Sequence, residues 1–234
     1  GAEPYGNYNR ILLSPVLAGE KTIEQIMLND EQWYIDNGIK LHKGKRVTEI
    51  DRAKRIVRAA DGTEEKYDRL ILATGSMPFI IPVPGKDLPG VVAFRDIQDV
   101  DRMLAAAAGK GHAVVIGGGL LGLEAANGLL KQGMQVSVVH LLDTLMEKQL
   151  DKPAAGLLKR SLEERGLNFL MGAQTEAILG KNKVEGVRFK DGLEIPADLV
   201  VMAVGIRPNA ELSKKIGLHS ERGVVVSDTL QTYD

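Results

Sequence analysis

The sequence predicts an α/β fold in which one parallel-sheet unit is inserted into a second, incomplete unit of the same design. The first observation is Ala113–Ala126, AVVIGGGLLGLEAA, where an apolar run ends in a glycine-rich bend that opens an apolar helix. The second is another apolar strand after that helix, Met134–His140, as a strand–helix–strand unit of a parallel sheet requires. The third is a repeat within the chain.

The repeat joins two stretches of similar pattern, Glu65–Pro78 and Glu194–Pro208. Each has an acidic start, an aspartate, an apolar run, a small-x-Gly loop and a proline three residues after the glycine. Each also follows short strands with a turn dipeptide, Asp61-Gly62 in the first copy and Asp191-Gly192 in the second. The pattern indicates two copies of one architecture, with chance similarity of two buried strands as the alternative. The first copy lacks an opening strand, glycine loop and helix, which we expect to lie before Gly1.

The first copy begins with residues 1–20, where we expect no complete helix or strand and a cut from a longer chain. Thr22–Gln25, TIEQ, fits a capping box, and Asp30 is placed to cap a short helix that ends at Gly38. Asp68–Pro78 predicts a strand buried on both faces, because Leu70–Ala73 do not alternate with polar residues, and the strand ends in the small-residue loop Thr74–Ser76. The extended pieces predicted to form an antiparallel meander before it are Ile39–His42, Val47–Asp51, Arg55–Ala59 and Glu64–Tyr67.

A proline- and glycine-rich stretch, residues 78–90, marks a domain boundary. We therefore divide the chain into residues 1–89, 90–212 and 213–234, with the last part returning to the first domain. Beyond the boundary the predicted helices are Asp96–Ala107, Leu120–Gln132 and Asp151–Arg165. The strands predicted after Met134–His140 are Leu167–Met171, Thr175–Leu179, Val184–Lys190 and Leu193–Ile195, and Asp198–Pro208 closes the section with an apolar strand and its glycine loop.

Composition excludes several classes of function. A formal net charge of −1 over 234 residues gives no long-range field that selects nucleic acid or an acidic membrane. The absence of cysteine removes disulfides, thiol nucleophiles and cysteine-ligated metal or iron–sulfur sites from this stretch. The histidines lack metal-ligand spacing, so no metal site is expected. With no signal peptide or long apolar run, we expect a cytoplasmic protein without a membrane or nucleic-acid partner.

The glycine-rich bend has the spacing Gly117-x-Gly119-x-x-Gly122 between strand and helix, which gives the motif its weight. Gly117 permits the tight turn, Gly119 lets a pyrophosphate approach the backbone, and Gly122 allows close helix–strand packing. The helix N-terminus supplies N–H groups and partial positive charge for the phosphates. The motif predicts a dinucleotide site; the alternative is a glycine-rich turn without a ligand.

Over its whole length the chain resembles the FAD- and NAD(P)-dependent pyridine nucleotide oxidoreductases. That resemblance implies two Rossmann-like dinucleotide-binding domains, the NAD(P) type inserted in an incomplete FAD type. It rests on the GGGLLGLEAA segment lying between an ATG loop, Ala73–Gly75, and a GIRP loop, Gly205–Pro208. Within the superfamily the chain is most similar to the flavin-containing N-terminal part of assimilatory NAD(P)H nitrite reductase large subunits, followed by NADH-dependent rubredoxin and ferredoxin reductases. The stretches that carry this are GNYNRILLSPVLAGEKT, LATGSMPFIIPVPGKDLPGV, VVIGGGLLGLEAANGLL and VVHLLDTLMEKQLD.

The resemblance implies a role for each matching residue. For the flavin these are Arg10 and Ser14 lining it, Val47 at the FAD adenine, and Thr74 and Gly75 at the FAD pyrophosphate. For NAD(P)H they are Gly117, Gly119 and Gly122 at the phosphates, with Glu124 and Gly205 near the nicotinamide. Each of several has a plainer alternative: a surface ion pair for Arg10, turn geometry for Thr74 and Gly75, strand core for Val47, and the helix dipole for Glu124.

His140 departs from the family pattern, because a carboxylate usually stands there to bind the ribose hydroxyls. A histidine cannot accept two hydroxyls as a carboxylate does, and in its protonated form it favours a 2′-phosphate. The choice between NAD and NADP therefore stays open, with a lean to NAD because no lysine or arginine adjoins His140. Asp143, three residues on, is the nearest acid in the sequence.

The resemblance implies a fragment of a flavoprotein reductase that takes hydride from NAD(P)H to FAD and passes electrons onward, toward nitrite in an assimilatory nitrite reductase. Siroheme and an iron–sulfur cluster belong to parts outside this chain, and the expected partner is an electron-accepting module or small subunit. No catalytic residue is named, because cofactors carry the hydride step. Since the FAD glycine loop and the C-terminal flavin-contacting strand are absent from the sequence, we expect weak FAD binding or none. The alternatives are a rubredoxin or ferredoxin reductase, a non-catalytic nucleotide-binding module, and a purely structural domain.

Overall fold

The computed structural model describes residues 1–233, which fall into two compact units. Unit 2 comprises Arg10–Ile26 and Pro78–Gly205; unit 1 comprises Gly1–Asn9, Met27–Met77 and the residues from Ile206 on. The chain thus leaves unit 1 after Met77 and returns at Ile206, earlier at both crossings than the domain limits given above, and Arg10–Ile26 groups with unit 2. Within residues 1–233, no helix is long and apolar enough to cross a membrane.

Unit 2 is built on a five-stranded parallel sheet of order β5-β12-β6-β7-β8. Its strands are β5 (Val91–Ala93), β6 (His112–Ile116), β7 (Gln135–His140), β8 (Asn168–Met171) and β12 (Leu199–Met202). The central strand β6 is covered on both faces, with Val114 and Val115 fully buried, as its unbroken apolar run predicts.

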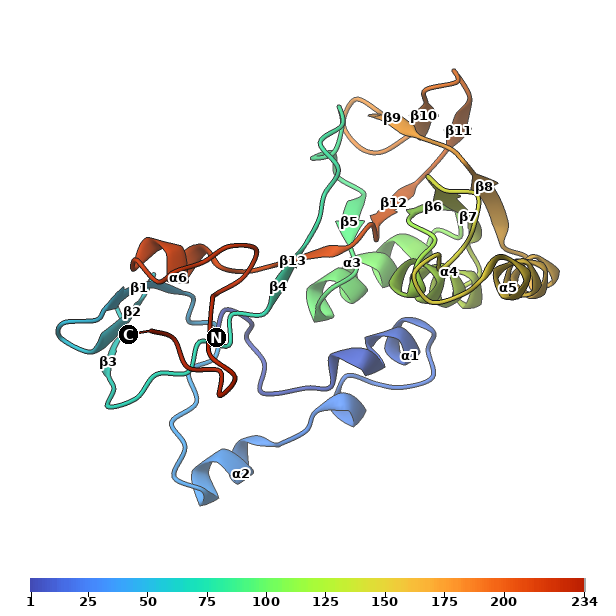
Figure 1. Ribbon diagram of the computed structural model, residues 1–234. Helices are drawn as coiled ribbons and strands as arrows, with labels where there is room; N and C mark the ends of the chain where they lie inside the picture. Colours follow the sequence, from blue (N-terminus) through green and yellow to red (C-terminus); the bar gives the residue numbers. More distant parts are fainter. Residues whose placement is uncertain (234) are drawn as a thin grey trace. The chain divides into compact units, whose positions relative to one another are not determined.

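Two layers cover this sheet (Figure 1). Helices α3 (Ile97–Ala107), α4 (Leu120–Lys131) and α5 (Lys152–Glu164) gather on one side, and the meander of β9 (Thr175–Leu179), β10 (Gly186–Phe189) and β11 (Glu194–Pro196) lies on the other. Alternate sheet residues, such as Val114 and Met202, pack with Phe189 of the meander in one buried cluster. The resulting core fixes the carboxyl ends of the strands, where the glycine loop lies.

A segment from early in the sequence completes the helical layer. It contains the 3₁₀ turns η1 (Arg10–Leu12) and η2 (Glu24–Ile26) and the helix α1 (Leu13–Leu17), which packs on α3 and α4. Helix α1 lies in a stretch where the sequence predicted no complete helix; it buries Leu13, Val16 and Leu17, so its packing on α4 explains its formation. The capping box before η2 is confirmed, with Thr22 N donating to Gln25 Oε1 at 3.0 Å and Gln25 N to Thr22 Oγ1 at 3.4 Å.

Unit 1 contains a three-stranded antiparallel meander, β1 (Val47–Asp51), β2 (Ile56–Ala59) and β3 (Glu64–Lys66), with the short helices α2 (Glu31–Asp36) and α6 (Glu211–Lys215). Asp30 caps α2, accepting from Trp33 N at 2.8 Å, and Gly38 follows with a positive φ of 64°, both as predicted. The strands β4 (Ser76–Pro78) and β13 (Ile206–Pro208) pair as a two-stranded sheet.

The two turns of the repeat match in detail. In the first copy Ala59 N donates to Thr63 O, and Thr63 N donates to Asp61 Oδ1; in the second, Phe189 and Leu193 make the equivalent bonds around Asp191. Gly62 and Gly192 have φ values of 86° and 89°. The repeated meander architecture predicted from the sequence is therefore confirmed.

The strand after each meander differs between the copies. β12 is buried in the sheet, but residues 68–75 form no strand, so the buried strand predicted at the start of Asp68–Pro78 is wrong; Ser76–Pro78, where the loop was expected to end, is extended as β4. Ile71 is 89% exposed. A parallel strand forms only against neighbours, and the part of unit 1 that the structure describes offers this segment none. The prediction of an extended Ile39–His42 is also wrong, and β5 was not predicted.

Candidate functional site

The glycine loop lies at the topological switch point of the unit 2 sheet. From β6 the chain proceeds outward through β7 to β8, and β12 lies on the opposite side of β6. The carboxyl ends of β6 and β12 are therefore adjacent, and they lead into Gly117–Gly119 and Ala203–Gly205. Ligands of open α/β sheets bind at this position, outside the strand ends where the strand order reverses.

The backbone of the loop leaves no room for side chains at two of its glycines. Gly117 has a φ of 126°, and a Cβ there would lie 2.3 Å from the carbonyl oxygen of Ala203. A Cβ on Gly122 would lie 1.9 Å from the carbonyl oxygen of Gly117. These contacts give Gly117 the tight-turn role and Gly122 the close-packing role that the motif predicts.

Gly119 is different, because a Cβ there would meet nothing within 4 Å. It is the N-cap residue of the 12-residue α4, in extended conformation at φ −84° and ψ 179°, with no side-chain cap. The first backbone N–H groups of α4 have no acceptor within the helix, and the space beside its N-cap Gly119 is open, with the partial positive charge of the helix behind it. This geometry fits the pyrophosphate of a dinucleotide.

Glu124 lies one turn into α4 and accepts a hydrogen bond from Ser14 Oγ of α1 at 2.7 Å. The helix begins at Leu120 and has no acidic residue in its first turn, so the dipole does not explain Glu124 as the plainer alternative supposed. Instead, α1 brings Ser14 to it: Leu17 of the same helix packs on Gly128, where a Cβ would lie 2.7 Å from Leu17 Cγ. Two sequence-predicted site residues, Ser14 and Glu124, are thus in direct contact.

Arg10 is held at the end of β5. Its guanidinium donates to the carbonyl oxygen of Arg95 at 3.0 Å, and Arg95 N in turn donates to Asp99 Oδ2 at 2.8 Å. Burial raises the pKa of Asp99 above its ordinary value of 3.8, with the nearby Asp96 adding to the effect. Arg10 thus binds a backbone carbonyl group at the edge of the site, and its side chain is half-buried.

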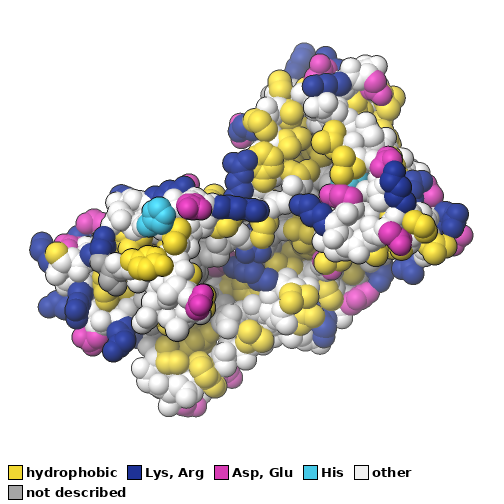
Figure 2. All heavy atoms as spheres, in the orientation of Figure 1, with side chains coloured by type: hydrophobic (Ala, Val, Ile, Leu, Met, Phe, Trp, Pro, Cys, Tyr) yellow, Lys and Arg dark blue, Asp and Glu magenta, His cyan; other side chains and the backbone are white. Residues whose placement is uncertain are grey.

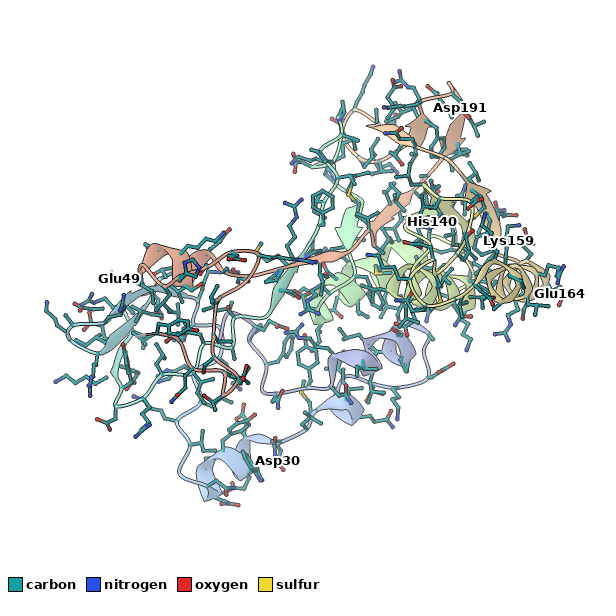
Figure 3. The ribbon with its side chains drawn as sticks, in the orientation of Figure 1. Asp30, Glu49, His140, Lys159, Glu164 and Asp191 are labelled. Carbon is teal, nitrogen blue, oxygen red and sulfur yellow. The ribbon has the colours of Figure 1, made fainter. Side chains whose placement is uncertain are left out.

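His140 ends β7 and faces the glycine loop, where Gly118 N donates to His140 Nδ1 at 3.1 Å. Its other ring nitrogen, Nε2, lies 3.3 Å from Glu147 Oε2. His140 is labelled in Figure 3, among the sheet strands of unit 2. Sequence reasoning missed Glu147, because no local pattern shows that the loop after β7 folds back on His140. Asp143, the acid nearest to His140 in the sequence, points elsewhere: it pairs with Lys152 at 3.2 Å and its side chain is 76% exposed.

The remaining predicted residue of unit 2 is Gly205, which follows β12 with a φ of 118° and accepts from Phe79 N at 2.9 Å. In unit 1, Thr74 Oγ1 donates to the carbonyl oxygen of Asn209 at 2.6 Å, and Asn209 N donates to Gly75 O at 2.9 Å. Val47 is 36% exposed at the start of β1, so the alternative that it is strand core is wrong. Three of the predicted residues belong to unit 1, namely Val47, Thr74 and Gly75. The other eight belong to unit 2: Arg10, Ser14, Gly117, Gly119, Gly122, Glu124, His140 and Gly205.

Charge contributes little to locating the site. On the face drawn in Figure 2, basic and acidic side chains are interspersed over both units, in keeping with the net charge of −1. No group of three or more histidine, aspartate or glutamate side chains is arranged to hold a metal ion among the residues described. What distinguishes this edge of the sheet is backbone geometry: a side-chain-free bend, an open helix N-terminus and the ordered residues around them.

Comparison with known proteins agrees with this geometry. A family model described as "Pyridine nucleotide-disulphide oxidoreductase" matches residues 2–234. The chain is 56% identical over 232 residues to "Nitrite reductase [NAD(P)H]" of Bacillus subtilis (strain 168), covering 99% of this chain and 29% of that protein. It is 47% identical over 232 residues to "Assimilatory nitrate reductase electron transfer subunit" of the same organism, covering 99% of this chain and 30% of that one.

Among solved structures, the putidaredoxin reductase of a covalent putidaredoxin reductase–putidaredoxin complex matches with a TM-score of 0.92 and 31% identity. The match covers 100% of this chain and 58% of that one. The chain thus spans less than a third of the two curated relatives and somewhat more than half of the solved one.

Proposed function

The chain belongs to the pyridine nucleotide-disulphide oxidoreductase family, and from that premise we propose that it is the coenzyme-binding part of an NAD(P)H-dependent flavoprotein reductase. The observation that carries the proposal is the open N-terminus of α4 beside Gly119, at the switch point of a parallel sheet. The two relatives from Bacillus subtilis are named for nitrite reduction and for electron transfer to nitrate reductase, so we propose that the electrons go to nitrogen-oxyanion reduction.

NAD(P)H fits unit 2. Its pyrophosphate would lie over Gly119 and the first N–H groups of α4, and Gly205 lies at the neighbouring strand end, on the side proposed for the nicotinamide. Glu124 would border the nicotinamide half, with its carboxylate held in one orientation by Ser14. When bound, the coenzyme supplies a hydride from its C4 atom; the protein's part is to bind, orient and exclude water.

FAD does not fit the described residues in the same way. Unit 1 holds an antiparallel meander and short helices, and the structure describes no parallel sheet with a glycine bend there. The FAD contacts Val47, Thr74 and Gly75 therefore stay proposals. We accordingly propose that this chain binds NAD(P)H by itself and retains FAD weakly or not at all.

The partner and the location are proposals of the same kind. An electron-accepting module or small subunit fits the relatives' names, and the alternative is a reductase of a small electron-carrier protein, which the solved relative bound to putidaredoxin favours. Siroheme and an iron–sulfur cluster would belong to parts outside this chain. A cytoplasmic location, expected from the sequence, belongs to the same proposal.

Isothermal titration of the purified chain with NADH and with NADPH, together with an absorbance scan for flavin, tests the proposal. We expect saturable binding of at least one coenzyme at a one-to-one ratio and a flavin signal well below stoichiometric. A chain that binds neither coenzyme contradicts the coenzyme site. A chain that carries one flavin per molecule contradicts the proposal of weak FAD binding. Binding without any electron transfer by the full-length protein would favour a non-catalytic nucleotide-binding module.

A further inference from the structure

The loop after β7, residues 141–150, is anchored to the glycine loop at its middle. Leu145 is buried, and its side chain would contact a Cβ placed on Gly118. Met146 N donates to Gly118 O at 3.1 Å, and Met146 adopts a positive φ of 50°. A non-glycine residue in that region costs about 1 kcal/mol or more, and such strain persists only where the surroundings impose it. The loop therefore has a fixed conformation, which brings Glu147 to His140.

The hydrogen bonds of His140 determine which of its nitrogens carries the proton. A backbone N–H can only donate, so Nδ1 of His140 must accept from Gly118 N. In the neutral ring the proton is then on Nε2, which donates to Glu147 Oε2. Both ring nitrogens are occupied in this way, and the His140 side chain is only 11% exposed. His140 is thus not available to bind a ribose; it orients Glu147.

Glu147 has the properties that the missing ribose acid would need. Its side chain is 32% exposed, so a ligand can reach it, and among residues 1–233 no partner besides His140 is recorded for its carboxylate. A carboxylate has about four lone-pair sites, so Oε1 and part of Oε2 stay free to accept. It lies beside the loop that would hold the pyrophosphate, where the adenosine ribose of a dinucleotide follows.

We propose that Glu147, positioned by His140, accepts the hydrogen bonds of the adenosine ribose hydroxyls and selects NADH over NADPH. The inference rests on the proposed coenzyme site and identifies its selectivity residue. A carboxylate at this place repels the 2′-phosphate of NADPH, whereas it accepts hydrogen bonds from the two hydroxyls of NADH. The seven-residue separation from the usual position is bridged by the folded loop.

Glu147→Gln tests the proposal by titration of the chain with NADH and NADPH separately. A hydrogen bond to a charged group contributes enough that its loss weakens NADH binding by about tenfold or more. NADPH binding should stay the same or become tighter. The Kd for NADPH divided by the Kd for NADH should therefore fall by at least the same factor. Glu164→Gln is the matched control: it removes the same charge from an exposed position at the C-terminal end of α5 (Figure 3) and should leave both constants unchanged.

Two substitutions of His140 separate positioning from folding. His140→Gln places an amide N–H near the position of Nε2 and should keep most of the preference for NADH. His140→Asn places its carbonyl near the position of Nδ1, where it can accept from Gly118 N, but cannot reach Glu147, so the preference should fall toward that of Glu147→Gln. A merely structural role would weaken both coenzymes equally and leave the ratio unchanged.

The outcomes also distinguish this inference from the proposed function. If neither coenzyme binds the unmodified chain, the coenzyme site itself is wrong. If NADH binds but Glu147→Gln leaves the NADH-to-NADPH ratio as it was, the site stands and the role of Glu147 is overturned. A preference for NADPH in the unmodified chain would overturn it as well.

Discussion

Alanine substitutions at Gly122 and Gly119 should separate stability from coenzyme binding. Gly122→Ala should destabilise the fold, whereas Gly119→Ala should keep the fold and weaken NADH binding. In Gly122→Ala the new Cβ would lie 1.9 Å from the Gly117 carbonyl oxygen, whereas real Cβ contacts essentially never fall below 3.0 Å. Loop and helix must therefore separate by about 1.1 Å, the difference 3.0 − 1.9. Overpacking of this kind lowers the free energy of unfolding by about 1–3 kcal/mol. In a chain of this size, that lowers Tm by about 2–12 °C.

Gly119→Ala should leave the fold intact. Nothing lies within 4 Å of its Cβ, and its φ of −84° suits alanine. The entropy gain of about 0.4–1 kcal/mol from a Gly→Ala change is offset by the poorer N-cap, so stability stays within about 1 kcal/mol of the original. The methyl group would, however, occupy the space proposed for the pyrophosphate. Loss of one backbone-to-phosphate hydrogen bond, about 1.5–3 kcal/mol, weakens NADH binding roughly 10- to 100-fold.

Thermal unfolding and titration with NADH, measured on both variants, check these expectations. Gly156→Ala on α5 is the control, because its Cβ also meets nothing within 4 Å and it lies in a helix interior away from the loop. It should raise stability by up to about 1 kcal/mol and leave NADH binding unchanged. If Gly119→Ala folds normally and binds NADH as the unmodified chain does, the pyrophosphate does not lie over Gly119 and the reasoning fails.

Three further predictions follow from contacts around the site and the sheet. Burial lowers the pKa of His112 below 6.5. As the pH drops below about 6.5 the unfolded chain binds this proton before the folded chain does, so the free energy of unfolding falls. His112→Gln should reduce this pH dependence in thermal melts, and an unchanged profile would contradict the prediction. Ser14→Ala should weaken NADH binding by the chain about fivefold in titration, because Glu124 loses the donor that orients it, and Ser14→Thr should restore the affinity; an unchanged affinity would contradict this role of Ser14. Gly128→Ala should destabilise unit 2 by about 1–3 kcal/mol in denaturant unfolding, since its Cβ would meet Leu17; equal stability would mean that α1 shifts freely.

Features set by a few neighbouring residues could be predicted from the sequence. Asp30, Asp96 and Asp151 each accept from the backbone N–H three residues on, and each was expected to start its helix. The Asp-Gly turns and the glycine bend are of the same kind, because a positive φ or a nearby backbone atom excludes other side chains at those positions. The meanders, the central strand and the position of the candidate site follow from such features.

Features set by distant residues could not be predicted in this way. Ile71 has the local sequence of a buried strand, but it is exposed because a strand also needs a partner. Val91–Ala93 forms β5 because β12 lies beside it, although its own pattern is too short to predict a strand. The contact of Ser14 with Glu124 joins residues that are 110 positions apart, and only the packing of α1 on α4 creates it.

The candidate site contains features set by neighbouring residues and features set by distant ones, and the two would have different roles in binding. The backbone contacts of Gly117 and Gly122 allow no side chain, so the part that would bind the phosphates is fixed by the sequence motif itself. The part that would choose between coenzymes lies in residues 141–150, whose position depends on Leu145 and on the strained backbone of Met146. Glu147 can therefore be exchanged without disturbing the glycine loop, because its side chain is partly exposed and its contact is with His140 rather than with the glycines. The part that would bind the phosphates and the part proposed to select the coenzyme thus lie in different segments, so a substitution at Glu147 should change the preference while the glycine loop keeps its backbone geometry.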